Sequence, residues 1–87
     1  MTITHADFLR LLPKALTGLI HDITGNSIRV KLGSGALQIK LAPEGARKSG
    51  SLVLPVTHVT FYFENTGEIE RRKFIDRFYL AYQKGGG

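Results

Sequence analysis

The sequence predicts a small α+β domain, in which two amphipathic helices cover an antiparallel sheet. Three observations lead to this class. Apolar residues recur with a helical period near both ends of the chain, they alternate every second residue between those ends, and glycine-rich turns separate the alternating segments. The expected order is α-β-β-β(β)-α, a two-layer arrangement. The 87 residues suit one domain, predicted over residues 1–84, with a flexible glycine tail at 85–87.

The first helix is expected to begin after Thr4, whose side chain can cap it, and to end near Gly18. Its apolar positions share one face at about 100° per residue. Pro13 falls on the opposite face, where a lost backbone hydrogen bond is best tolerated. The last helix is expected over residues 66–84, and its apolar stripe consists of Phe74, Ile75, Phe78, Ala81 and Tyr82.

Strands are expected between the two helices. Residues 20–24 form a short candidate strand. The segments SIRVKL (27–32) and ALQIKLA (36–42) alternate strictly around the turn GSG, which indicates a hairpin with one apolar and one polar face. Residues 43–51 are polar and glycine-containing, and we expect them to form a loop.

Residues 52–64 are long for a single strand. Their apolar positions change parity near Thr57, which predicts a bulge, or two strands that meet at a bend. Because this is the last strand in the order, we expect it at a sheet edge, with His58, Thr60 and Tyr62 as candidate contact residues for a partner strand or a second copy of the chain. The alternative is that the bend lets the segment pair twice within its own domain.

The composition excludes several classes of chemistry. The chain has no cysteine, which excludes disulfides, thiolate catalysis and cysteine-ligated metals. The first residues lack the pattern of a signal peptide, and the longest apolar run, LVLPV, is too short to span a bilayer. We therefore expect a cytoplasmic protein with no membrane contact. The net charge of +5 permits an acidic partner.

Catalytic residues are not expected. The three histidines, His5, His21 and His58, have neither the spacing of a metal site nor a carboxylate cluster beside them. The serines lie in predicted turns, and no glycine-containing segment has the pattern of a phosphate-binding loop. The sequence thus predicts a protein that is not an enzyme and that holds no metal or cofactor.

Basic residues offer a candidate contact face. Lys73, Arg77 and Lys84 share one solvent face of the last helix, and Arg71 and Arg72 flank it. Arg47 and Lys48 lie in the expected loop, while Arg29, Lys31 and Lys40 lie on the polar face of the hairpin. These residues could contact a phosphate backbone. They could equally form a solvated face with local ion pairs, which is the interpretation we favour because acidic residues interrupt the basic run.

Two resemblances suggest alternative functions. The order of elements, with Arg71, Arg72 and Lys73 opening the last helix, resembles the double-stranded-RNA-binding domain, although the glycine and histidine signature of that family is missing. That resemblance implies phosphate contacts at the start of the last helix. The final residues Gly86 and Gly87 resemble the end of the ubiquitin-like sulfur carriers, whose terminal carboxylate is activated by an adenylating enzyme. The opening helix departs from the β-grasp fold of those carriers.

The sequence therefore predicts a small non-enzymatic binding or adaptor protein. Its partner is expected to be a protein or an acidic polymer, with a protein favoured, and a homodimer through the last strand is a further expectation. The alternatives are a sulfur-carrier-like protein and a weak binder of nucleic acid.

Overall fold

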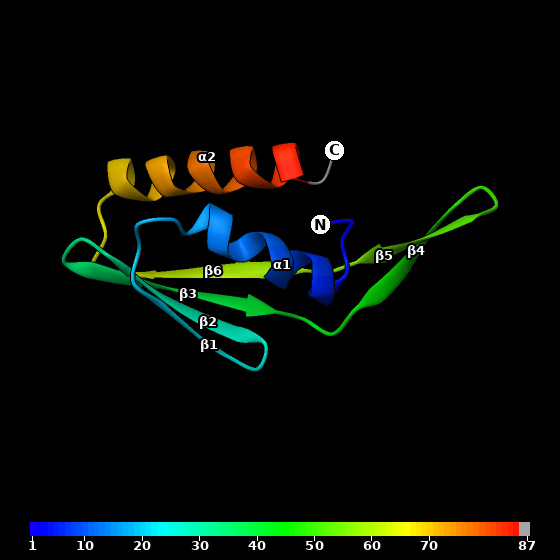
Figure 1. Cartoon of the computed structure of the whole chain (residues 1–87), viewed down its shortest axis with the longest axis horizontal. Coiled ribbons are helices and arrows are strands. Elements are labelled where there is room, and N and C mark those ends of the chain that lie inside the picture. The colour runs from blue at the N-terminus through cyan, green and yellow to red at the C-terminus, as the bar shows by residue number, and fades with distance from the viewer. Residues whose placement is uncertain (86–87) are drawn as a thin grey trace.

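The computed structural model describes residues 1–85, and for Lys84 and Gly85 it describes the backbone alone. Two helices and six antiparallel strands form a small α+β fold (Figure 1), which confirms the expected class. The elements are α1 (His5–Ala15), β1 (His21–Thr24), β2 (Ser27–Leu32), β3 (Gly35–Leu41), β4 (Gly45–Ser49), β5 (Leu52–Val56), β6 (Val59–Glu64) and α2 (Glu68–Gly85). The molecule is elongated, with extents of 47 × 24 × 21 Å.

The first helix forms as its sequence predicts. The side chain of Thr4 accepts a hydrogen bond from the backbone N of Asp7 at 3.1 Å, which satisfies one of the free donors of the first turn. Pro13 is exposed within the helix. At the other end, Leu16 N bonds Leu12 O at 2.9 Å, and Gly18 has a φ of 81°, a left-handed conformation that glycine adopts without a steric penalty.

The main sheet has four strands in the order β1-β2-β3-β6. The hairpin of β2 and β3 pairs Leu32 with Gly35, and β6 adds to the other side of β3 with Leu37 opposite Phe63. Gly35 lies so close to the end of β6 that a Cβ atom there would overlap the backbone carbonyl oxygens of Glu64 and Asn65. A glycine at this position therefore allows the two strands to meet.

The core lies between one face of the sheet and the two helices. The alternating apolar residues of β2 and β3 are buried, as the period of two predicted. An aromatic cluster joins β6 to α2: the ring of Phe61 lies 5.1 Å from that of Phe78 and 6.2 Å from that of Phe74. Phe8 of α1 completes this cluster, with its ring 5.0 Å from that of Tyr82. The opposite face of the sheet carries no helix in the described part of the chain (Figure 1).

A two-stranded arm extends from the main sheet, and here the expected loop was wrong. Residues 45–49 form β4, which pairs with β5 from Gly45–Val56 to Ser49–Leu52. The parity change has the predicted cause, because the chain breaks into β5 and β6 at residues 57–58. This is the second of the two predicted causes, two strands that meet at a bend. The extra residue lies on the other side of the ladder, where residues 42–44 stand against 57 and 58. The arm thus leaves the sheet at a bend (Figure 1).

Candidate functional site

The histidines do not form a common site. His5 Nε2 donates to the Ala42 carbonyl oxygen at 2.7 Å, and His21 Nδ1 lies 3.0 Å from the Leu19 carbonyl oxygen. Both rings are therefore used in local structure, and His58 is exposed at the bend. Within residues 1–85, no group of three potential His, Asp or Glu ligands lies close enough to hold a metal ion.

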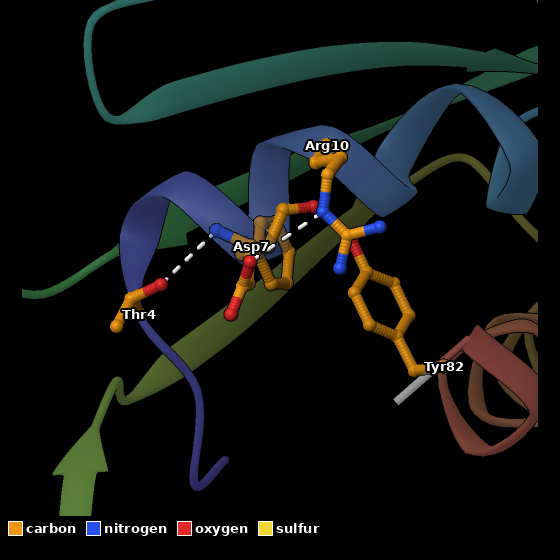
Figure 2. Close-up of polar contacts among 5 residues, drawn as sticks. Thr4, Asp7, Arg10 and Tyr82 are labelled. Atoms are coloured by element: carbon orange, nitrogen blue, oxygen red, sulfur yellow. Dashed lines mark hydrogen bonds and ion pairs between the residues drawn. The ribbon is translucent and has the colours of Figure 1, made fainter. Parts of the chain in front are cut away.

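A pocket of about 510 Å³ lies beside the N-terminus of α1. Figure 2 shows the polar groups at this place, with Arg10 Nε 3.4 Å from Asp7 Oδ1 and the Thr4 cap beside them. The Tyr82 hydroxyl donates to the Phe8 carbonyl oxygen at 2.7 Å, and burial raises the pKa of this phenol. These polar groups already bond one another or the backbone, so the pocket follows from helix capping and packing.

The predicted basic face on α2 does not form a free row of charges. Arg77 Nε donates to the Ala15 carbonyl oxygen at 3.1 Å, and its NH2 group donates to the Thr17 carbonyl oxygen. Arg77 therefore caps the C-terminus of α1, where unpaired carbonyls and the helix dipole favour a cation.

The other predicted basic residues of α2 are placed differently. Arg72 lies 3.7 Å from Glu68 in an exposed ion pair, and Arg71 and Lys73 are exposed. The side chain of Lys84 lies outside the described residues, as do Gly86 and Gly87, so the sulfur-carrier resemblance stays a prediction. Among the described side chains of α2, Arg77 is therefore used to cap α1 and Arg72 to form a local ion pair.

The uncovered face of the sheet carries a second basic group. Arg29 and Lys31 are exposed on β2, and Lys40 is exposed on β3. Lys40 Nζ lies 5.7 Å from the centre of the Tyr62 ring, an arrangement that favours a cation–π contact. Tyr62 is 52% exposed and offers one aromatic surface. Glu64 lies on the same face, because it pairs with Ala36, and it reduces the positive charge there.

The arm exposes both charged and apolar side chains. All five residues of β4 are exposed, including the predicted contact residues Arg47 and Lys48. Leu52 is 62% exposed and Val53 is 63% exposed, and these residues lie next to the turn at the tip. Because side chains alternate along a strand, Leu52 and Val53 project from opposite faces of the arm. Sequence reasoning missed this feature, although the run LVLPV beside a basic segment could have indicated it.

The strand β6 lies at an edge of the main sheet, since β3 is its one partner among the described strands. The three candidate contact residues predicted for this strand, His58, Thr60 and Tyr62, are all exposed. Their role in binding stays a prediction.

Comparison of the chain with protein-family models, with curated proteins and with solved structures finds no match. None of the helices in residues 1–85 is both long and apolar enough to cross a membrane.

Proposed function

We propose that this chain is a small non-enzymatic binding protein, and that its partner is a protein held by the β4–β5 arm. The observation that carries the proposal is the pair of large apolar side chains, Leu52 and Val53, that the tip exposes. Neighbouring exposed apolar side chains that lie outside the core provide surface that a protein partner can bury. The arm pairs with no other strand of residues 1–85, and a hairpin that stands alone is marginally stable in water. A partner that buries the arm would stabilise both strands.

The charge of the arm indicates the chemistry of the partner. Residues 45–56 contain two basic residues, Arg47 and Lys48, and no acidic residue. The register places Arg47 opposite Leu54 and Lys48 opposite Val53, so each face combines a cation with an apolar side chain. A complementary surface has an apolar slot with acidic residues at its rim. Complete burial of an aliphatic side chain is worth about 1.5–3 kcal/mol, so the two tip residues could contribute about 2–4 kcal/mol from their exposed area.

Site-specific photo-crosslinking in the cells that make the protein tests this proposal. A photoreactive residue at Ser51 lies at the tip, and one at Thr24, the exposed last residue of β1, is the control. We expect a discrete protein adduct from position 51 that position 24 does not give. The adduct should be lost when Leu52→Thr and Val53→Thr are combined, since threonine keeps the strand propensity and removes the apolar contact.

A matched variant separates the arm from general loss of apolar surface. Ile23 on β1 is 47% exposed, and Ile23→Thr should leave the tip adduct unchanged. The purified partner should bind the tip variant at least about tenfold more weakly than it binds the wild type, which corresponds to 1.4 kcal/mol. If position 51 gives no specific adduct, or if the tip variant gives the same adduct, the arm is not the binding site.

A second candidate function is weak binding of nucleic acid by the uncovered sheet face. It is favoured by the three basic residues Arg29, Lys31 and Lys40 beside Tyr62, since aromatic rings stack on bases and cations contact phosphates. Fluorescence anisotropy with single-stranded and double-stranded oligonucleotides tests it. Changing all three cations to glutamine should abolish the binding, and binding that persists above ~0.3 M salt would contradict an electrostatic contact.

A further inference from the structure

The backbone of β6 leaves a row of hydrogen-bonding groups directed away from the sheet. Ala42 N donates to the carbonyl oxygen of His58 at 2.9 Å, one step beyond the pair of Leu41 and Val59. Bonded and non-bonded pairs alternate in an antiparallel ladder, so the backbone groups of Thr60, Tyr62 and Glu64 are the ones directed toward β3. The N–H and C=O groups of Val59, Phe61 and Phe63 then point to the free edge.

The bonds of Thr57 support this alternation independently. Its backbone N donates to Met1 O, and Met1 N donates to Thr57 O, each at 2.7 Å. Thr57 has the same parity as Val59, so Met1 occupies the outer side of the strand one step before the free groups begin. At the other end, Asn65 has a φ of 52° and turns the chain away after Glu64. The free edge is therefore bounded to residues 59–63.

We propose that this edge pairs with the same edge of a second copy of the chain. Unpaired strand edges are surfaces that another strand satisfies, and here no lysine or proline of β6 opposes such pairing. An antiparallel register centred on Phe61 places Phe61 opposite its counterpart and Val59 opposite Phe63 of the second copy. All three outward-directed residues of each strand then form hydrogen-bonded pairs, and the two four-stranded sheets become one sheet of eight strands.

A match between imidazole donors and carboxylate acceptors favours this register. It brings His58 of each copy opposite Glu64 of the other, so that two such pairs form across the two-fold axis on the uncovered face. Within one chain these residues are about 20 Å apart along the strand, so neither pair can form inside a monomer. Thr60 lies opposite Tyr62 of the second copy and carries no charge. A shift by two residues removes both His–Glu pairs and leaves one outward-directed residue unpaired.

The position of α2 is also compatible with the two-fold axis of the proposed dimer. The bonds of Arg77 to the end of α1 identify the flank of α2 that faces α1. Ile75 comes two residues before Arg77, and Tyr79 comes two residues after it. Each is therefore about 160° from Arg77 around the helix axis, on the flank of α2 away from α1. Tyr79 is 49% exposed, and Ile75 is half-buried. In antiparallel pairing both helix layers lie on one side of the joined sheet, so these flanks of the two α2 helices face each other, with Ile75 and Tyr79 beside the exposed ion pair of Arg72 and Glu68.

Disulfide trapping tests both the pairing and the register, because the natural chain has no cysteine. In the proposed register Thr60 and Tyr62 of the second copy form a non-hydrogen-bonded pair with Cα atoms about 4.5 Å apart, which suits a disulfide. A mixture of Thr60→Cys and Tyr62→Cys proteins should form a mixed dimer under mild oxidation. Each protein alone should cross-link at least about tenfold more slowly, because identical positions lie on a diagonal about 7–8 Å apart.

Charge exchange provides the equilibrium measurement. Sedimentation equilibrium of the wild type should give a dissociation constant for the dimer. His58→Glu should raise the dissociation constant of the dimer at least about tenfold, because it places two like-charged pairs with Glu64 across the axis. His58→Glu combined with Glu64→Lys should restore the wild-type constant, because both pairs are then opposite in charge. Circular dichroism of each variant checks the fold. Each of three results overturns the proposal: a wild type that stays monomeric at the highest concentration that can be sedimented, mixed cysteine proteins that cross-link no faster than each protein alone, or a dimer insensitive to His58→Glu.

Discussion

Removal of the Arg77 guanidinium should destabilise the whole domain, although Arg77 lies on the outer part of α2. Arg77 joins α2 to the last turn of α1 through its two bonds to carbonyl oxygens. A hydrogen bond to a charged donor contributes about 1.5–3 kcal/mol when it is buried. One of these bonds is partly buried and the other is exposed, so we expect a combined contribution of about 2 kcal/mol after solvent screening.

Arg77→Met tests this value, because methionine keeps the apolar stem and removes the charged donors. Urea unfolding at 25 °C, followed by far-UV circular dichroism, gives the free energy of unfolding directly. For a domain of this size, a loss of about 2 kcal/mol lowers the melting temperature by about 8–16 °C. Arg77→Lys should recover less than half of the loss, since a single ammonium group cannot reach both carbonyls with the geometry of the planar fork.

Arg72→Met is the matched control for this experiment. Arg72 lies on the same helix and forms only an exposed ion pair with Glu68 at 3.7 Å. Exposed pairs of this kind contribute about 0.3–0.5 kcal/mol. If Arg77→Met and Arg72→Met lower the free energy of unfolding equally, Arg77 does not hold the two helices together. It would then again be a candidate contact residue of the basic face.

Three further measurements test the packing. Tyr82→Phe should lower the free energy of unfolding by about 1 kcal/mol at pH 7. Because burial raises the pKa of Tyr82, the wild type keeps this stabilisation below about pH 10 and loses it as the pH rises further. In urea titrations at alkaline pH, the free energy of unfolding of Tyr82→Phe should therefore fall less than that of the wild type. Gly35→Ala should cost about 1–3 kcal/mol because its Cβ meets backbone, whereas the control Gly67→Ala, with no atom within 4 Å of its Cβ, should change the melting temperature little. Replacing residues 46–55 with an Asn-Gly turn between the paired Gly45 and Val56 should change stability by less than about 1 kcal/mol, and a larger loss would mean that the arm belongs to the folding core.

The elements that carry a periodic pattern could be predicted from the sequence. The strands β2 and β3 alternate because one face is buried and the other is exposed, and the parity of their apolar residues sets which face is which. The bend at Thr57 was also visible, because the apolar positions before and after it have opposite parity and the chain divides into two strands there. For β2 and β3, burial on one face left a record in the order of apolar residues.

Features that depend on backbone bonds or on distant partners left no such record. The strand β4 has the sequence GARKS and is exposed on both faces, so no alternation distinguishes it from a loop. The position of Arg77 on a helical wheel identifies a face of α2. It does not reveal that the carbonyl groups of Ala15 and Thr17, about 60 residues earlier, end beside it. The order of strands in the sheet could not be predicted either, because the sequence allows β6 to pair with β1 or with β3.

The two proposed contact surfaces are separate in the fold, and this separation gives them a joint consequence. The arm continues from the N-terminal end of β6, whereas the edge pairing is centred on Phe61. A two-fold axis through that centre sends the two arms away from opposite ends of the joined sheet. A partner with repeated sites would then be held by both arms of one dimer, and the second contact would be intramolecular, which raises the apparent affinity without any new contact. If both proposals hold, loss of the arm should leave dimerisation through residues 59–63 unchanged, whereas loss of dimerisation should weaken binding to a partner with repeated sites.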